Sequence, residues 1–203
     1  MSDMSVRVAA VVLAAGGAKR FGRLKQLLPW QGGTLLTQVV DTALASSARP
    51  VVVVVGAQAE DCRAALRGRP VQVVVNPEWA QGQSTSVQAG LAALPPDIDA
   101  ALFLLADQPA VQSSTLEQLI ACYDATRAPL VWPEWNGRRG NPVLFDRRLF
   151  PELMALRGDV GARLVLQAHA AEAERVPVSD AGILLDIDTP NDYEKLASRH
   201  GGC

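Results

Sequence analysis

A cluster of glycines and cations near the start of the chain carries the clearest chemical signal in the sequence. Three glycines and four cations fall within ten residues: Gly16, Gly17, Lys19, Arg20, Gly22, Arg23 and Lys25. Glycine lets backbone N–H groups turn toward a ligand, and cations attract an anion with several negative oxygens, such as a phosphate. A solvated basic turn between a strand and a helix has the same composition. Taken alone, the cluster favours that simpler interpretation.

Three aspartates follow later apolar segments, at places where strands are expected to end. Asp107 comes directly after Ala100 to Leu105, and Asp186 and Asp188 lie at the end of Ile183 to Ile187. In open α/β sheets ligands bind beyond the carboxyl ends of the strands, and carboxylates from two strand ends suit Mg²⁺ with phosphates and water. A capped turn or a solvated strand end explains each aspartate alone. Their joint placement with the glycine loop favours a metal–nucleotide site.

A further polar segment follows the strand expected at Val71 to Val75. Asn76 and Pro77 end that strand, and the run from Gly82 to Ser86 opens a helix that reaches about Leu94. The unpaired N–H groups and hydroxyls of such a helix start can read a nucleobase edge or hold an anion. Ordinary helix capping explains the same pattern, and both interpretations stay open.

Between these segments, apolar runs alternate with amphipathic helices. Five consecutive valines before Gly56 indicate a strand covered on both faces, as in a parallel sheet. Thr34 is a predicted N-cap for the first helix. We expect strands at 6–13, 50–55, 71–75, 100–105, 130–132 and 183–187. We expect helices at 34–46, 59–66, 82–94 and 115–125. A short helix should follow the Gly-Asp-x-Gly turn in 156–166, and a last helix should begin at about Pro190.

From Glu134 the alternation stops. Turn residues at Asn136-Gly137 and again at Gly140 to Pro142 precede an apolar run, which predicts a hairpin region and not another βα unit. The whole pattern predicts an α/β fold with a doubly wound, mainly parallel sheet and one inserted hairpin region. We expect a single domain over residues 1–203, since 203 residues with 49% hydrophobic content can bury one substantial core.

Composition limits the classes of partner. The net charge of −2 argues against a general nucleic-acid or membrane surface. No apolar run approaches the roughly 18 residues of a membrane helix, and the N-terminus lacks a basic region with an apolar core behind it, so we expect a soluble, cytoplasmic protein. The three cysteines are far apart and indicate reduced thiols, and the two histidines have no partner at metal-ligand spacing.

Two common nucleotide-binding motifs are missing from the sequence. There is no GxxxxGK[ST] P-loop, and the glycines of the N-terminal cluster have the wrong spacing for GxGxxG. The second strand ends at Val55-Gly56 and not in an acidic residue that would bind a ribose. A nicotinamide-dependent oxidoreductase is therefore a disfavoured alternative.

The stretch LAAGGAKRFGRLKQLLP (Leu13 to Pro29) resembles the LAAGxSxRxGxxKxLLP signature of MobA-like nucleotidyltransferases, and more closely the molybdenum cofactor cytidylyltransferase family. The similarity continues through NPEWAQGQSTSVQAGL, LADQP, GNPVLF, LRGDVGAR and DIDTPNDY, from about Val8 to Leu196. Guanylyl-transferring relatives resemble LAGG where this chain has LAAG, so Ala15 favours CTP over GTP. The chain departs from the signature at Ala18, where the family usually has a serine that would contact the triphosphate.

The resemblance implies a Rossmann-like nucleotidyltransferase fold with assigned site residues. The implied nucleotide-binding residues are Leu13, Ala14, Ala15, Gly16, Gly17, Arg20, Lys25, Gly82 and Ser86. The implied catalytic residues are Lys25, Arg20 and Asp107, and the implied Mg²⁺ ligands are Asp107 and Asp188, with Asp186 as a third candidate. The implied acceptor-binding residues are Asn141, Pro142 and Arg163, within an acceptor-binding insertion at about residues 134–166.

The resemblance also implies a reaction, the transfer of CMP from CTP to the phosphate of molybdopterin with release of pyrophosphate. A phosphate monoester is largely ionised near pH 7, so no histidine base is needed. We expect Lys25 and Asp107 on exposed loops, where alanine substitution would remove turnover and leave the fold intact. The implied partners are CTP, a molybdopterin-type acceptor, and a molybdoenzyme or its chaperone. A related transferase acting on a sugar or alditol phosphate, and a cofactor carrier without transferase activity, remain as alternatives.

Overall fold

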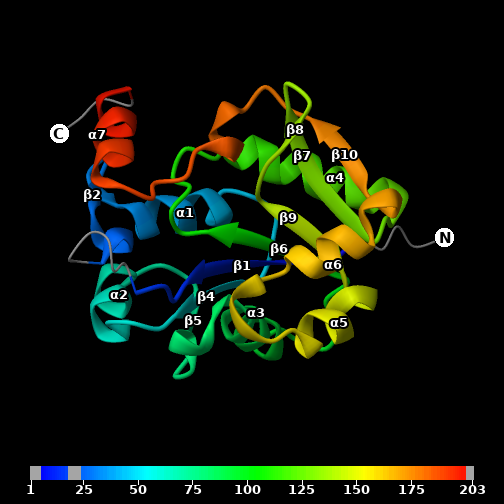
Figure 1. The fold of residues 1–203 in the computed structure, drawn as a ribbon, viewed down its shortest axis with the longest axis horizontal. Coiled ribbons are helices and arrows are strands. Elements are labelled where there is room, and N and C mark those ends of the chain that lie inside the picture. The colour runs from blue at the N-terminus through cyan, green and yellow to red at the C-terminus, as the bar shows by residue number, and fades with distance from the viewer. Residues whose placement is uncertain (1–5, 18–23, 200–203) are drawn as a thin grey trace.

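The fold is built on one mixed sheet of eight strands (Figure 1). The structure is a computed structural model and describes residues 6–17 and 24–199. The strands of this sheet are β1 (Val8–Ala14), β4 (Val51–Val55), β5 (Gln72–Val75), β6 (Ala100–Leu105), β7 (Leu130–Trp135), β8 (Arg138–Arg139), β9 (Val143–Asp146) and β10 (Glu174–Pro177). Their order is β10-β7-β9-β6-β1-β4-β5, with β8 paired to β7.

The sheet is mainly parallel, as the sequence predicts. Strand β1 pairs in parallel with β4 and β6, β4 pairs in parallel with β5, and β7 pairs in parallel with β10. Strand β9 runs antiparallel between β6 and β7. Strand β9 belongs to the predicted hairpin region and lies between two other strands. Part of that region therefore lies inside the sheet and contributes to its central surface.

Seven α-helices are described: α1 (Leu35–Leu44), α2 (Ala59–Ala65), α3 (Gln83–Ala92), α4 (Ser113–Thr126), α5 (Phe150–Ala155), α6 (Arg163–Ala168) and α7 (Pro190–Arg199). Six 3₁₀ turns connect them: η1 (Lys25–Leu27), η2 (Trp79–Gln81), η3 (Arg147–Leu149), η4 (Gly158–Val160), η5 (Ala170–Glu172) and η6 (Ala181–Leu184). A separate hairpin, β2 (Pro29–Trp30) with β3 (Gly33–Thr34), lies beside α7, where the Tyr193 hydroxyl donates to the Pro29 carbonyl at 2.6 Å.

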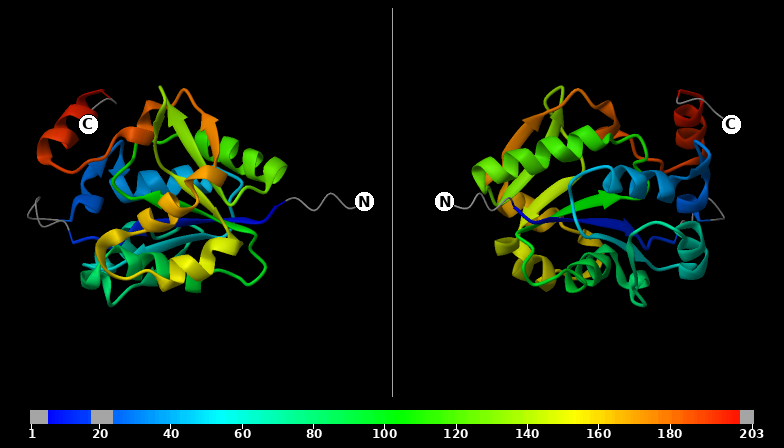
Figure 2. Two further views of the ribbon diagram at one scale, coloured as in Figure 1. Left: turned by 45° about the vertical axis from the view of Figure 1, so that its right-hand side comes forward. Right: turned by 180° about the vertical axis from the view of Figure 1, so that it is seen from behind.

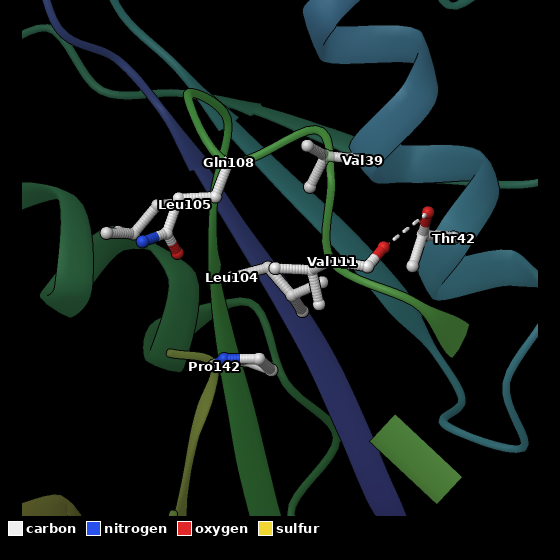
Figure 3. Close-up of a pocket in the computed structure, with 7 residues that line it drawn as sticks. All are labelled: Val39, Thr42, Leu104, Leu105, Gln108, Val111 and Pro142. Carbon is white, nitrogen blue, oxygen red and sulfur yellow. Dashed lines mark hydrogen bonds between the residues drawn. The ribbon is translucent and has the colours of Figure 1, made fainter. Parts of the chain in front are cut away.

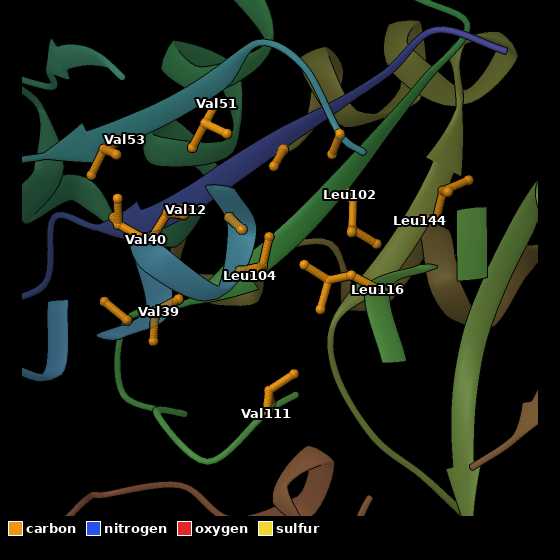
Figure 4. Close-up of a cluster of buried hydrophobic side chains, with 14 of the residues drawn as sticks. Val12, Val39, Val40, Val51, Val53, Leu102, Leu104, Val111, Leu116 and Leu144 are labelled. Carbon is orange, nitrogen blue, oxygen red and sulfur yellow. The ribbon is translucent and has the colours of Figure 1, made fainter. Parts of the chain in front are cut away.

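Helices cover both faces of the sheet (Figure 2). One apolar cluster joins α1 and α4 to side chains such as Val12, Val53 and Leu102 (Figure 4). A second cluster joins α3, α5 and α6 to the opposite face through residues such as Phe103 and Phe145. Central strands buried on both faces account for the unbroken valine run of β4, since polar alternation there would bury polar side chains.

The predicted N-cap of the first helix is confirmed. The Thr34 hydroxyl accepts a hydrogen bond from the Thr37 backbone N–H, and the Thr37 hydroxyl accepts one from the Thr34 N–H at 2.7 Å. The predicted hairpin is also confirmed, because β7 and β8 pair antiparallel across Asn136 and Gly137, both with positive φ. Type I′ geometry of this kind suits Asn-Gly.

The predicted strand at Ile183 to Ile187 is wrong. Residues 181–184 form η6, which Asp180 caps by accepting from the Gly182 N–H, and the following segment docks on the loop after β6 through Ile187 N–H to Asp107 carbonyl. The last strand is β10, whose side chains are mostly exposed. An edge strand that pairs only through its backbone carries little apolar signal, whereas the apolar run at 183–187 packs without strand pairing.

A small void lies between α1 and the loop that follows β6 (Figure 3). Its volume is about 10 Å³, and Leu104, Gln108, Val111 and Pro142 are among its lining residues. That volume has room for about one water molecule, so the void cannot hold a substrate. Across the described residues, no helix is both long and apolar enough to cross a membrane.

Candidate active site

Lys25 joins two segments that lie far apart in the sequence. Its ammonium Nζ donates to Asp107 Oδ2 at 2.7 Å, to Asp188 Oδ1 at 3.1 Å and to the Ile187 carbonyl at 3.1 Å. Asp107 follows β6, and Asp188 precedes α7. The structure thus brings together three of the sequence-predicted site residues at the carboxyl edge of the parallel strands.

The pair of Lys25 and Asp107 is largely shielded from water. Their side chains are 18% and 23% exposed, while that of Asp188 is 57% exposed. Burial lowers the pKa of Lys25, but the charge of Asp107 and the hydrogen bonds to Asp107 and Asp188 outweigh it, so this pKa lies above its ordinary value. The expectation that Lys25 and Asp107 lie on exposed loops is wrong. Both side chains are partly buried, where each charge is stabilised by the opposite charge of the other.

Asp107 keeps one carboxylate oxygen free for a further ligand. Its Oδ1 is buried and has no hydrogen-bond partner in the structure. Within residues 6–17 and 24–199 no group of three or more His, Cys, Asp or Glu side chains could hold a metal ion alone. A divalent cation at Asp107 and Asp188 would therefore share its other positions with phosphate oxygens and water, which is the donor set that Mg²⁺ prefers. The residues present fit such a shared cation.

Asp186 has a different environment from the other two aspartates. Its Oδ1 accepts a hydrogen bond from Gln108 Nε2, and it makes no ion pair with Lys25. Burial raises the pKa of Asp186, and the negative charges of Asp107 and Asp188 add to that effect against the Gln108 hydrogen bond and the positive charge of Lys25. The structure therefore separates Asp186 from the Lys25 contacts and ties it to the loop after β6.

A cavity of about 510 Å³ opens beside Lys25. Its walls come from the end of β1, the start of α3 and the end of β6, and they include the predicted residues Leu13, Ala15, Gly16, Gly17, Lys25, Gly82, Ser86 and Asp107. A volume of this size suits a small-molecule ligand. Ala14 does not line the cavity: it is 2% exposed and packs in the core. Arg20 and Ala18 lie outside the described residues.

Gln26 is a site residue that the sequence interpretation missed. Its side-chain Nε2 donates to the carbonyls of Gly16 at 2.6 Å and Ala14 at 3.2 Å, and the side chain also lines the cavity. Because the carbonyl and the following N–H of a trans peptide point in opposite directions, Gln26 turns the N–H of Gly17 away from its own side chain. The sequence signal that could have identified Gln26 is its position directly after Lys25.

Trp79 supports the glycine loop from the other side. A Cβ at Gly17 would lie 2.7 Å from Trp79 Cζ3, and a Cβ at Gly56 would lie 2.6 Å from Trp79 Cβ. Both distances are shorter than real carbon contacts, so glycine at these two positions lets the indole pack directly on the backbone. Trp79 also lines the cavity and forms part of its wall.

The start of α3 is held by a polar network. Asn76 Nδ2 donates to the hydroxyls of Thr85 at 2.8 Å and Ser86 at 3.0 Å. At Gly82, φ is +123° and a Cβ would lie 2.4 Å from the Gly158 carbonyl carbon, so glycine lets η4 pack onto the helix start. The hydroxyls of Thr85 and Ser86 are thus internally bonded, and Ser86 still borders the cavity.

A second cavity of about 400 Å³ adjoins the first. The two share Leu13, Gln83, Leu105 and Asp159 as lining residues. Two of the predicted acceptor residues, Asn141 and Arg163, line the second cavity. Pro142 does not line the second cavity. It lines the small void between α1 and the loop after β6 (Figure 3). Arg139, which no sequence motif singled out, also lines the second cavity.

Comparison with known proteins identifies related sequences and folds. The profile of the MobA-like NTP transferase domain matches residues 10–174. The chain is 33% identical to a nicotine blue oxidoreductase of Paenarthrobacter nicotinovorans, over 93% of this chain and 96% of that protein. It is 26% identical to the molybdenum cofactor cytidylyltransferase of Escherichia coli K12, over 94% and 95% of the two chains.

Solved structures share the fold. Rv0371c of Mycobacterium tuberculosis H37Rv superposes with a TM-score of 0.86 at 30% identity, covering 96% of this chain and all of that one. The same mycobacterial protein has been solved as a complex with manganese, with a TM-score of 0.82. The doubly wound fold and the family resemblance of the sequence are both confirmed by these matches.

Proposed function

Since this chain belongs to the MobA-like NTP transferase domain family, we propose that it transfers CMP from CTP to the phosphate of a molybdopterin-type acceptor and releases pyrophosphate. The observation that carries the proposal is the pair of adjoining cavities, with Lys25 and Asp107 in the wall of the first. Two substrates that exchange a nucleotidyl group need neighbouring binding spaces that meet at the reacting phosphates. The named E. coli relative, a molybdenum cofactor cytidylyltransferase, supports the choice of substrates.

The nucleotide occupies the first cavity in this proposal. Leu13 contacts it from the end of β1, and Ala15, Gly16 and Gly17 contact it from the glycine loop. Gly82 and Ser86 contact its base and ribose from the start of α3. Ala15, only 4% exposed, selects CTP over GTP through the shape that its methyl group gives to the loop. Arg20, outside the described residues, is assigned to the phosphates by the sequence signature alone.

The chain's own residues supply positioning and charge. An oxygen of the acceptor phosphate attacks the α-phosphorus of CTP, an O–P bond forms, and the bond from the α-phosphorus to its bridging oxygen breaks, so pyrophosphate leaves with the electron pair. The Lys25 ammonium counters charge that builds at the α-phosphate, and Asp107 holds it at the cavity wall. An already ionised phosphate needs no general base.

Asp107 and Asp188 hold a divalent cation in this proposal. Such a cation, when bound, neutralises phosphate charge and aligns the phosphate oxygens. The free Oδ1 of Asp107 supports the assignment, as does the manganese complex of the mycobacterial relative. Mg²⁺ is the proposed physiological ion. Asp186 is the least favoured ligand because Gln108 already occupies its Oδ1.

The acceptor occupies the second cavity, with Asn141 and Arg163 among its contacts. Residues 134–166 form an acceptor-binding insertion in one nucleotidyltransferase domain that spans the chain. A molybdoenzyme or its chaperone would receive the product. Pro142 acts indirectly in this arrangement, by fixing the backbone next to Asn141.

Pyrophosphate release tests the proposal. Purified protein is incubated with CTP, GTP or ATP, with Mg²⁺ or Mn²⁺, and with molybdopterin or ribitol 5-phosphate as acceptor. We expect release with CTP and molybdopterin, and its loss in Asp107→Asn. Release only with ribitol 5-phosphate contradicts the acceptor, and molybdopterin binding without release from any nucleotide indicates a carrier. Oxidation of NADH or NADPH in place of pyrophosphate release would point to the activity named for the Paenarthrobacter relative.

A further inference from the structure

Strand register builds the floor of the second cavity. Phe103 of β6 lies opposite Val143 of β9, and Phe145 of β9 lies opposite Leu130 of β7. Because side chains alternate across a strand, Phe103, Val143 and Phe145 face the same side of the sheet. The two phenylalanine rings meet edge to face, with centroids 5.6 Å apart and planes at 87°. The floor is therefore apolar and aromatic, with its two rings nearly perpendicular to each other.

Arg139 stands at one end of this floor. Its guanidinium carbon lies 5.5 Å from the centroid of the Trp132 ring, and Trp132 is 4% exposed. A cation–π contact over an indole face restrains a guanidinium and leaves its N–H groups available. Within the described part of the chain Arg139 makes no hydrogen bond or ion pair, so its five donors are free to bind a ligand.

The cavity has an excess of positive charge. Arg139 and Arg163 are its two cationic lining residues, and Asp159 is the one acidic lining residue among those described. Asp159 already accepts a hydrogen bond from the Gln83 N–H at 3.3 Å. The uncharged amides of Gln83 and Asn141 complete the polar rim. A guest with an apolar aromatic part, polar edges and negative charge complements this combination.

Arg139 lies at the end remote from the reacting phosphates. The first cavity sits at the ends of β1 and β6, whereas β8 is paired to β7, beyond the intervening strand β9. The shared residues Leu13 and Leu105 mark the end of the second cavity that meets the first. An acceptor that places its phosphate there would lay its other end toward Arg139.

From this geometry we infer that Arg139, placed over the Trp132 ring, is an acceptor-specificity residue. It binds the polar edge of an anionic heteroaromatic acceptor that packs against Phe103 on the apolar floor of the second cavity. The inference rests on the proposed function, and it adds the residue that selects the acceptor. Arg139 acts on acceptor affinity and not on the transfer step.

Arg138 supplies a matched control. It is the neighbouring residue of the same two-residue strand, is exposed like Arg139, and points to the opposite face because strand side chains alternate. Calorimetric titration of the full chain with 6-carboxypterin, without nucleotide, compares wild type with Arg139→Met, Arg139→Lys and Arg138→Met. Ribitol 5-phosphate is the non-planar anionic probe, and melting temperatures confirm folding.

We expect the wild type to bind 6-carboxypterin and Arg139→Met to bind it about tenfold or more weakly, since a charged hydrogen-bonding group is lost. Arg139→Lys should lose nearly as much, because an ammonium lacks the planar fork, and Arg138→Met should match the wild type. In turnover assays Arg139→Met should raise the acceptor KM and leave kcat and the KM for CTP unchanged.

Equal losses in Arg139→Met and Arg138→Met would overturn the inference, as would wild-type binding of ribitol 5-phosphate alone or of neither probe. Failure of the proposed function gives a different pattern. Pterin binding that depends on Arg139, without pyrophosphate release, contradicts the transfer reaction and upholds the residue assignment. Normal pyrophosphate release with an unchanged acceptor KM in Arg139→Met upholds the transfer reaction and contradicts the role of Arg139.

Discussion

Replacing Lys25 with Met tests whether one side chain serves both the fold and the reaction. The substitution removes three contacts of 2.7, 3.1 and 3.1 Å and leaves Asp107, 23% exposed, without its counter-charge. Breaking a fully buried pair costs roughly 3–5 kcal/mol, and partial exposure reduces this to about 2 kcal/mol. For a chain of this size we expect a melting temperature lower by about 4–8 °C. Turnover should fall about 10²-fold or more.

The pH dependence has a definite sign. Because the folded-state pKa of Lys25 lies above its ordinary value of 10.5, its contribution to stability is fully present below pH 10.5 and is lost as pH rises through the raised pKa. The difference in unfolding free energy between wild type and Lys25→Met should therefore be constant near neutral pH. It should shrink only above pH 10.5, as measured by denaturant unfolding.

A double-mutant cycle separates stability from turnover. In Lys25→Met with Asp107→Asn no carboxylate is left uncompensated at Asp107, so the double variant should be more stable than Lys25→Met, with a coupling of about 1–2 kcal/mol. Turnover should stay lost. Lys195→Met, at an exposed position on α7, is the control and should match the wild type. Additive stability losses in the cycle, or near-normal turnover in Lys25→Met, would refute the reasoning.

Three further predictions follow from the site. Asp186→Asn should raise the melting temperature at pH 7, because burial raises the pKa of this carboxyl and the neutral amide still accepts a hydrogen bond from Gln108. The gain in melting temperature should vanish below pH 3.8. Loss of turnover in this variant would instead mark Asp186 as a metal ligand. Gly82→Ala should destabilise more than Gly68→Ala, since both have positive φ but only Gly82 also meets backbone at 2.4 Å; equal thermal shifts would show that the packing contact is unimportant. Ala15→Gly should shift the ratio of kcat/KM for CTP over GTP toward GTP, and an unchanged ratio in pyrophosphate assays would remove Ala15 from base selection.

Local pattern was sufficient for the central strands and the first helix cap. The valine run of β4, the apolar run of β6 and the Thr34 cap all depend on residues within one element, and each lies where it was predicted. The edge strand β10 and the segment at 183–187 were missed or misassigned for one reason. Pairing at a sheet edge is a backbone property, and an apolar run packs equally well without it.

The sequence by itself determined that this chain forms a mainly parallel α/β sheet with a glycine loop, Lys25 and Asp107 at strand ends, because periodicity and turn chemistry are local. Only the tertiary structure decided that Lys25 would meet Asp188 across 163 positions of the chain, and that the pair with Asp107 would be partly buried. It also placed Arg139 on Trp132 at the second cavity. Such contacts depend on strand order and register, which bring together side chains that no short-range pattern connects.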